Sequence, residues 1–350
     1  MGNQLFRKGY IVMLFFLTVM IGFLFVFTPK AISEEDVITW NFSLWGGKRA
    51  WTVPLHEWAA AMEKKTNGRW RIKLHYGGVL APSKEQLDGI RAGMFEAAGI
   101  CCAYTPGKVP LHTVHELPLI APDENIDIFQ MVVELWKHPA LRKELLKWNA
   151  VPLLASSLSQ LHLMGNKPIR KVEDLDGARI RVTGLQAKVL EEFGAVPTLV
   201  PAPEVYGALS RGTIDLVGFR WTHGYGAFKT YEISKYVSTP VSLGTMSCFY
   251  IANKDAWDAL PEEFKQYHME WYDKSPKVWA AEYKKADDKW IPIFKKHLEF
   301  IDFPASERNK IVARAEEFYE EWVKAREEQG LPGRDVLNYY LKKRKELVGY

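Results

Sequence analysis

The sequence predicts an α/β protein with two lobes of related topology around a ligand cleft, followed by C-terminal helices. Two stretches, "EQLDGIRAGMFEAAG" (85–99) and "EVYGALSRGTIDLVG" (204–218), align without a gap, and a strand candidate precedes each of them, at 69–76 and 195–201. After residue 255, apolar residues recur at helical spacing with charges between them. Two lobes leave a cleft between them, and such clefts are common sites for small ligands.

Each of the two aligned stretches reads as part of a strand–helix–strand unit. The helices end at Gly93 and Gly212, residues typical of the position just after a helix. An acidic residue follows each turn, Glu96 in the first unit and Asp215 in the second. This order predicts a parallel strand pair with a right-handed crossover in each lobe. Chance similarity between two ordinary units is the alternative.

Residues 1–33 differ in kind from the rest of the chain. Arg7 and Lys8 precede an apolar run (11–27), and Ser33 closes a small-residue cleavage pattern. This order is typical of a secretory signal peptide that is cleaved on export. An uncleaved membrane anchor is the alternative, because the run is slightly short for a full span. In either case we expect the remaining chain in the periplasm.

The charge balance excludes one class of partner. The chain carries 46 Lys and Arg against 42 Asp and Glu. Residues 1–33 hold three of the basic residues and no acid, which leaves 43 basic and 42 acidic residues in the mature protein. A nearly neutral protein argues against a nucleic-acid partner, which would require a basic surface.

The three cysteines do not read as a disulfide framework. Cys101 and Cys102 are adjacent in the apolar run "AAGICCAY" and are typical of small buried strand residues, while Cys248 stands far away. An exported disulfide scaffold carries more cysteines, and the chain has no CxxC motif. We therefore expect stability to come from the hydrophobic core.

The stretch "DLDGARIRVTG" (174–184) raises a question about two arginines. Its alternation predicts a strand with Ile180 and Val182 on one face and Arg179 and Arg181 on the other. An edge strand with one solvated face is one interpretation. The other is that one arginine faces a cleft and binds an anion.

A family resemblance favours the cleft. "KPIRKVEDLDGARIRV" (167–182) resembles the segment that carries the carboxylate-binding arginine in the extracytoplasmic solute receptors of TRAP (tripartite ATP-independent periplasmic) transporters. Similar pieces at 66–93, 204–218 and 249–263 come in the family's order. The resemblance implies a type II periplasmic-binding-protein fold, in which hinge strands and a long helix join two α/β lobes that close over a small organic acid.

This fold implies a division of the chain and a function. The expected parts are a signal peptide at 1–33, mainly lobe 1 at 34–160, mainly lobe 2 at 161–255, and a helical region at 256–350 that packs on both lobes. The resemblance implies a periplasmic receptor that captures a small carboxylate and delivers it to the membrane-embedded TRAP permease subunits. We expect it to act without a cofactor, as a monomer or as a homodimer formed through the C-terminal helices.

An exported α/β enzyme that acts on a small organic acid is the alternative. Its motifs are weak: "HEWAA" (56–60) lacks the second histidine of a zinc helix, and "HTVHE" (112–116) precedes a loop-like run. We expect structural or surface histidines there. The sequence contains no GxSxG, Walker or GxGxxG motif.

The resemblance assigns ligand carboxylate binding to Arg181. A planar guanidinium forms a bidentate, charge-assisted clamp on a carboxylate, which agrees with that role. Arg179 either supports Arg181 or meets solvent near the rim.

"GFRWTHGYG" (218–226) departs from part of the family. Some oxo-acid receptors carry an acid before a tryptophan here, and the pair helps to hold a cation. This chain has Arg220 before Trp221, and an arginine is not a metal ligand. We therefore expect no metal, and both residues are predicted to contact the ligand. Arg220 facing solvent is an equal alternative.

Two aromatic residues of the first lobe complete the predicted site. Trp45, beside the glycines of "FSLWGGKRAW" (42–51), is expected to wall the pocket, and Tyr104 is expected to contact the ligand after its strand. Trp51 and Phe249 are expected in the core.

Overall fold

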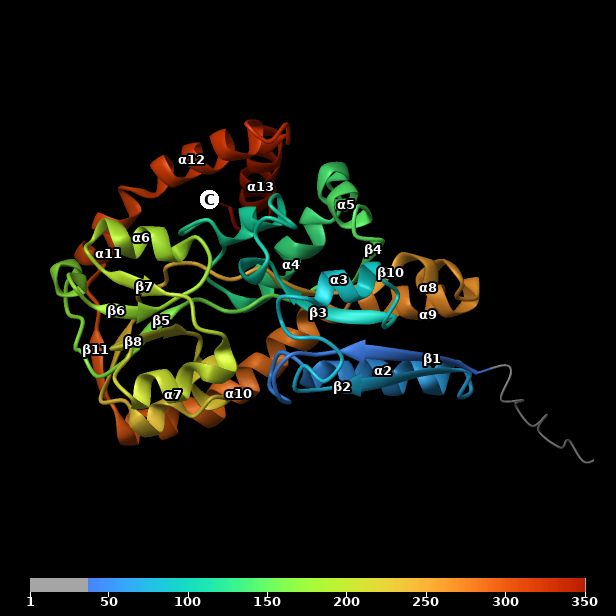
Figure 1. The fold of residues 1–350 in the computed structure, drawn as a ribbon, viewed down its shortest axis with the longest axis horizontal. Coiled ribbons are helices and arrows are strands. Elements are labelled where there is room, and N and C mark those ends of the chain that lie inside the picture. The colour runs from blue at the N-terminus through green and yellow to red at the C-terminus, as the bar shows by residue number, and fades with distance from the viewer. Residues whose placement is uncertain (1–36, 350) are drawn as a thin grey trace, which may run out of the picture. The chain divides into compact units, whose positions relative to one another are not determined.

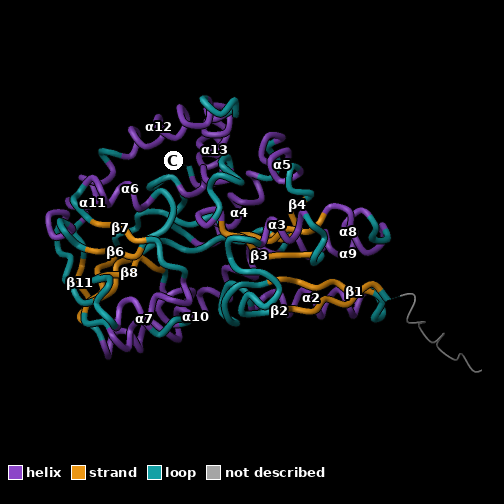
Figure 2. The backbone as a smooth tube through the Cα atoms, viewed as in Figure 1, coloured by secondary structure: helices purple, strands orange, loops and turns teal. Residues whose placement is uncertain are grey.

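Two β-sheets carry the fold, one in each lobe (Figure 1). The structure is a computed structural model that describes residues 37–349, without the side chains of 222–223 and 315–316. The expected signal peptide at 1–33 lies outside the described residues. From Ile38 onward the chain forms a single unit, and Figure 2 shows its strands gathered in two groups.

The first sheet has five strands in the order β2-β1-β3-β10-β4. Their bounds are β1 Ile38–Ser43, β2 Trp70–His75, β3 Ala97–Cys101, β4 Ala150–Leu154 and β10 Cys248–Asn253. Strand β1 pairs in parallel with β2 and β3, while β10 runs antiparallel to β3 and β4. β3 and β10 are buried along their whole length, as expected for the central strands of a covered sheet.

The second sheet has six strands in the order β11-β9-β5-β8-β6-β7. Their bounds are β5 His162–Gly165, β6 Arg179–Arg181, β7 Val196–Thr198, β8 Leu216–Phe219, β9 Tyr236–Thr239 and β11 Glu299–Asp302. Strand β6 pairs in parallel with β7 and β8, and β5 runs antiparallel to β8 and β9. The two sheets therefore repeat one topology, with β6, β7 and β8 in the places of β1, β2 and β3.

The two repeated units contain the predicted parallel strands, with one difference in pairing, and the right-handed crossover stays a prediction. β2 and β3 are parallel, as are β7 and β8, but β1 lies between the first pair and β6 between the second. The crossover therefore skips one strand position in each sheet. Both glycines that end the crossover helices adopt a positive φ, +67° at Gly93 and +66° at Gly212, as expected for that position.

Two extended segments and one long helix connect the lobes. Segment 155–161 leads from β4 to β5, and segment 240–247 leads from β9 back to β10. The two segments pair through backbone hydrogen bonds, including Leu161 N to Gly244 O at 3.2 Å. The long helix α10 (Ser275–His297) packs on α4 (Asn125–Leu135) and α2 (Val53–Lys65) of the first lobe and on the turn Trp221–Gly226 of the second. This confirms the predicted two-lobed fold with hinge strands and a long helix.

The other helices cover the sheets and the C-terminal side. Their bounds are α2 Val53–Lys65, α3 Gln86–Arg91, α4 Asn125–Leu135, α5 Pro139–Leu146, α6 Gln186–Glu192, α7 Val205–Ser210, α8 Lys254–Asp258, α9 Glu262–Tyr272, α11 Ala305–Val312, α12 Ala315–Glu327 and α13 Gly333–Val348. None of the described helices is long and apolar enough to span a membrane.

The last helices return from the second lobe to the first. Ile311 of α11 belongs to the apolar core of the second lobe, whereas Trp322 of α12 and Tyr340 of α13 belong to a core shared with α4. Because α13 buries Val336 and Leu337 there, its apolar face is used for packing within the chain. The expected domain limits at 33, 160 and 255 stay a prediction.

A disulfide corrects the expectation that the core alone stabilises the fold. Cys101 of β3 and Cys248 of β10 face each other in the antiparallel register and are bonded, with their Cα atoms 4.1 Å apart. Cys102 is the free, buried cysteine among the described residues. The disulfide was not evident from the sequence because its two cysteines are 147 positions apart.

Candidate functional site

Arg181 lies at the carboxyl end of β6, in the centre of the parallel part of the second sheet. Ile180 points into the core on one face, and the Arg181 side chain on the other face is only 1% exposed. Arg179, two residues earlier, reaches solvent instead and forms two hydrogen bonds with Asp215, at 3.0 and 2.6 Å. The two arginines therefore have different roles, because Asp215 neutralises Arg179 and Arg181 stays inside.

The guanidinium of Arg181 is only partly satisfied by the described protein atoms. Its Nε donates to the carbonyl oxygen of Val200 at 2.8 Å, and its Cζ lies 4.5 Å from the centre of the Phe219 ring. Nη1 and Nη2 are buried without a hydrogen-bond partner of good geometry among the described residues. Burial lowers the pKa of Arg181, and the nearby Tyr104 phenol opposes that shift.

Arg220 follows β8 directly, on the strand next to β6. It is 1% exposed, so the solvent-facing alternative is wrong. Its Nε donates to the Ser159 carbonyl oxygen at 2.9 Å, while Nη2 has no partner among the described residues. Burial, together with the positive charge of Arg181, lowers the pKa of Arg220 to about 10. The two guanidinium groups are therefore within electrostatic reach of each other.

Trp45 and Tyr104 meet at the same edge of the first sheet. Trp45 lies in the loop after β1, and Tyr104 ends the 3-10 turn Cys102–Tyr104 after β3. Their rings contact edge to face, with centroids 5.3 Å apart, and both residues are buried. Since Tyr104 also interacts with Arg181, the structure brings together four predicted residues: Trp45, Tyr104, Arg181 and Arg220.

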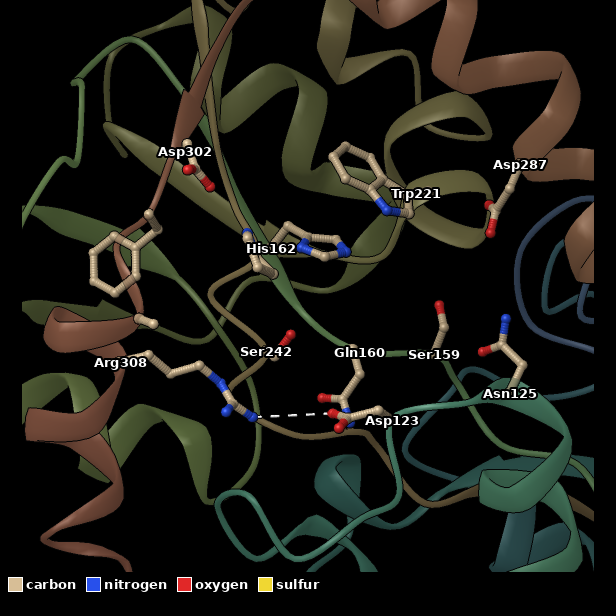
Figure 3. A pocket seen from close by; sticks show the side chains of 13 residues that line it. Asp123, Asn125, Ser159, Gln160, His162, Trp221, Ser242, Asp287, Asp302 and Arg308 are labelled. Carbon is tan, nitrogen blue, oxygen red and sulfur yellow. Dashed lines mark ion pairs between the residues drawn. The ribbon is translucent and has the colours of Figure 1, made fainter. Parts of the chain in front are cut away.

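Trp221 is placed differently from those four residues. It is half-buried and stacks on His162, with ring centroids 4.2 Å apart. It lines a cavity of about 630 Å³ beside the hinge segments (Figure 3). Asp123 and Arg308 pair across the same cavity at 3.9 Å. A ligand contact of Trp221 stays a prediction.

Arg49 is a residue of this site that sequence reasoning missed. Its guanidinium lies 4.4 Å from the ring centre of Trp45 and 4.9 Å from that of Trp51, and the residue is 5% exposed. Nη1 donates to two backbone carbonyl oxygens of its own loop, Trp45 at 3.2 Å and Gly47 at 2.7 Å. Nε and Nη2 are buried without a partner among the described residues.

Glu116 and Tyr283 also border the arginines. Oε1 of Glu116 accepts hydrogen bonds from the backbone N–H groups of Ala103, at 3.1 Å, and Ser247, at 3.0 Å. Burial raises the pKa of Glu116 to about 8, although the charge of Arg220 opposes the shift. Tyr283 on α10 donates to the Ser157 carbonyl oxygen at 3.1 Å and interacts with both Arg49 and Arg220.

The histidines of "HTVHE" are structural, as expected. His112 pairs with Glu144 at 2.6 Å, and both side chains are buried. His115 joins the Tyr340 hydroxyl, at 2.8 Å, to the Ser157 hydroxyl, at 3.1 Å, and burial lowers its pKa to about 3. Within residues 37–349, no group of three or more His, Cys, Asp or Glu side chains is arranged to hold a metal ion.

Comparison with protein families gives a match over most of the chain. Residues 45–325 match the model of "Bacterial extracellular solute-binding protein, family 7". A "monocarboxylate 2-oxoacid-binding periplasmic protein" of Nostoc sp. is 28% identical over 59% of this chain and 57% of that protein. The "C4-dicarboxylate-binding periplasmic protein DctP" of Rhodobacter capsulatus is 27% identical over 58% of this chain. The aligned parts span 57% and 61% of the lengths of these two relatives.

Solved structures share the fold. One is a TRAP solute-binding protein from a marine metagenome, specific for aromatic acid ligands and crystallised with 3-hydroxybenzoate. It superposes with a TM-score of 0.79 at 20% identity, covering 89% of this chain and 99% of that chain. This confirms the two-lobed periplasmic-binding fold predicted from the sequence.

Proposed function

The chain belongs to family 7 of the bacterial extracellular solute-binding proteins, and on that premise we propose that it is a receptor for a small organic acid. It captures the acid between its lobes and delivers it to the membrane-embedded subunits of a TRAP permease. Residues 1–33 direct its export, and the receptor works in the periplasm. These functions agree with the names of its relatives, which bind carboxylates and aromatic acids.

One observation supports carboxylate binding above the others. Both terminal nitrogens of Arg181 are buried and have no hydrogen-bond partner of good geometry among the described residues, although the Tyr104 phenol interacts with the guanidinium. Leaving a buried charge unpaired costs several kcal/mol. A ligand carboxylate supplies two parallel acceptors for these nitrogens, and hydrogen bonds to charged groups contribute about 1.5–3 kcal/mol each.

Isothermal titration calorimetry of Arg181 variants tests this function. Arg181→Ala is expected to lower the affinity for an acid ligand by about two decades, at about 1.4 kcal/mol per decade. Arg181→Lys is expected to bind poorly as well, because an ammonium provides a single point charge in place of the planar fork. Arg179→Ala is the matched control, since Asp215 and solvent surround that side chain. Wild-type affinity in a folded Arg181→Ala variant would contradict the assignment of carboxylate binding to Arg181.

A second measurement separates a receptor from an enzyme. We expect the bound acid to be recovered chemically unchanged after long incubation, while it raises the melting temperature of the protein. Conversion of the acid by the wild-type protein, lost in Arg181→Ala, would support the enzyme alternative.

A further inference from the structure

A cavity behind the hinge is lined by side chains that the proposed acid site does not use. Its volume is about 630 Å³, within the range of cavities that hold small organic molecules. Both lobes and both hinge segments contribute to its wall, among them Asn125 at the start of α4, Ser159 and Ser242 of the hinge segments, and Asp302 at the end of β11. Figure 3 shows these side chains around one space.

The strand order of the second sheet separates this cavity from Arg181. The hinge segments join β5 and β9, which are neighbours in the order β11-β9-β5-β8-β6-β7. Because β11, β9, β8 and β6 share one direction and β5 runs opposite, the carboxyl ends of β11 and β6 lie at the sheet edge where the hinge is attached. Asp302 ends β11 on one side of the hinge, and Arg181 ends β6 on the other. The cavity is therefore distinct from the proposed acid site.

Negative charge dominates the described wall of the cavity. Asp123, Asp287 and Asp302 contribute three carboxylates, and Arg308 contributes one guanidinium. Arg308 pairs with Asp123, with Nη2 and Oδ1 3.9 Å apart (Figure 3). The described lining side chains therefore carry an excess of two negative charges, which favours a cationic occupant.

One buried side chain presents a nitrogen to the same space. His162 is 7% exposed, its Nδ1 lies 3.1 Å from the Thr239 hydroxyl oxygen, and its ring stacks on Trp221. Nε2 has no hydrogen-bond partner among the described residues, and the ring borders the cavity (Figure 3). Burial, together with the charge of Arg220, lowers the pKa of His162 to about 3, so the imidazole is uncharged at neutral pH. With its proton on Nδ1, toward Thr239, the ring offers Nε2 as a hydrogen-bond acceptor.

Two of the carboxylates lie apart from each other. Asp287 belongs to α10 and Asp302 to the end of β11, and Figure 3 shows Trp221 and His162 between them. Neither aspartate is fully buried, and an ion pair that solvent reaches contributes little free energy by itself. A cation that binds firmly here must therefore contact both carboxylates, which requires two charged groups joined by a spacer.

We infer that this cavity is a second binding site and that its ligand is a short alkyl chain with an ammonium group at each end. One ammonium pairs with Asp302 and the other with Asp287, and Nε2 of His162 accepts a hydrogen bond from one of them. Phe303 and Pro240, which also line the cavity, border the alkyl chain. The two positive charges of such a ligand balance the excess charge of the described wall.

Titration calorimetry of the wild-type protein tests the inference with three matched compounds. They are 1,4-diaminobutane, 1-aminobutane and 1,4-butanediol, which have the same chain length and carry two, one and no positive charges. We expect the diamine to bind at least about tenfold more tightly than the monoamine, which is one decade in affinity, and the diol not to bind. Magnesium chloride at the concentration of the diamine is expected not to displace it.

Variants locate the bound diamine. Asp302→Asn and Asp287→Asn are each expected to lower its affinity by about tenfold, to the level of the monoamine. Asp288→Asn is the matched control, because Asp288 lies on the same helix, pairs with Lys284 and is not among the residues that line the cavity. Arg181→Gln is expected to weaken acid binding and to leave diamine binding unchanged.

Four results would overturn the inference. The first is no binding of the diamine, or binding no tighter than that of the monoamine. The second is an equal loss in Asp288→Asn and Asp302→Asn, which would show a general attraction to the acidic surface. The third is displacement by magnesium, which would show a site for any dication. The fourth is loss of diamine binding in Arg181→Gln, which would place the diamine in the acid site. None of these results bears on the receptor function, which the acid titrations test separately.

Discussion

Gly184 of the second lobe lies directly against Glu116 of the first. A Cβ atom at position 184 would be 2.9 Å from Oε2 of Glu116 and 3.4 Å from the Cβ of Ala103. Gly184 comes three residues after Arg181, and its φ of +72° lies in the left-handed region. The lobes thus touch beside the arginine that we assign to the ligand, and a glycine permits their close approach.

Gly184→Ala is expected to weaken ligand binding more than it weakens the fold. The added methyl group meets Glu116 and Ala103 only when the lobes are together, so it shifts the population away from the closed state. Oε1 of Gln186, which would be 3.1 Å away within the same lobe, is the end of a flexible side chain that can move aside. Gly212→Ala is the matched control, because Gly212 has a φ of +66° and a methyl group added there would have no described atom beyond its chain neighbours within 4 Å. Both variants bear a backbone cost of about 1 kcal/mol in urea denaturation. Calorimetry should then show an affinity loss of about tenfold for Gly184→Ala alone, and equal losses would contradict the lobe contact.

The raised pKa of Glu116 predicts how the free energy of unfolding changes with pH. Its folded pKa of about 8 lies above the ordinary value of 4.5, so between these pH values the folded state holds a proton that the unfolded state releases. The free energy of unfolding therefore falls as pH rises through this window, by up to about 1.4 kcal/mol per pH unit from this group. Glu116→Gln mimics the protonated form and is expected to abolish this fall.

Urea denaturation of both proteins at pH 5, 6, 7 and 8 checks that expectation. The buried His115, His162 and His268 have lowered pKa values, about 3, 3 and 4, so each loses its contribution to stability as pH falls below about 6.5. Subtracting the variant's curve from that of the wild type cancels these histidine terms. Parallel curves would show that Glu116 is already ionised at pH 5.

The disulfide between Cys101 and Cys248 is expected to contribute measurable stability. It closes a loop across 147 positions, and removing a crosslink of this kind typically costs about 2–4 kcal/mol because the unfolded chain gains freedom. A Cys101→Ala, Cys248→Ala double variant should show that loss in urea denaturation. Cys102→Ala, which removes a free buried thiol from the same region, controls for lost packing. Equal stability of the double variant and the oxidised wild type would contradict the expectation.

The sequence predicted the features that depend on residues close together along the chain. The alternation of "ARIRV" places Ile180 inside and Arg181 on the opposite face, and the aligned stretches at 85–99 and 204–218 predict two sheets of one topology. Both features follow from the order of neighbouring residues within a short segment. The family resemblance then distinguished Arg181 from Arg179, which alternation alone places on the same face.

The sequence did not predict the features that depend on contacts between residues far apart in the chain. Arg49 follows a lysine in the loop before α2, a pattern typical of exposed residues, and in the structure it packs on the rings of Trp45 and Trp51 and is buried. The partner of Cys101 becomes evident only when β10 returns from the second lobe to pair with β3. Arg220 is similar, because the carbonyl oxygen that accepts from its Nε belongs to Ser159, 61 positions earlier in the chain.

Ligand binding is expected to survive exhaustive chelation at unchanged affinity. The family resemblance implies an acid at the position of Arg220 in receptors that bind with the help of a cation, whereas a guanidinium donates hydrogen bonds without binding metals. The positive charges of Arg181 and Arg220 also repel a cation, since unit charges a few ångströms apart interact by several kcal/mol even in a polar protein environment. The measurement is calorimetry of the protein dialysed against EDTA, with and without added calcium or sodium. Binding that disappears in chelator and returns with either ion would overturn the metal-free site, and it would also require an anionic group close to Arg220.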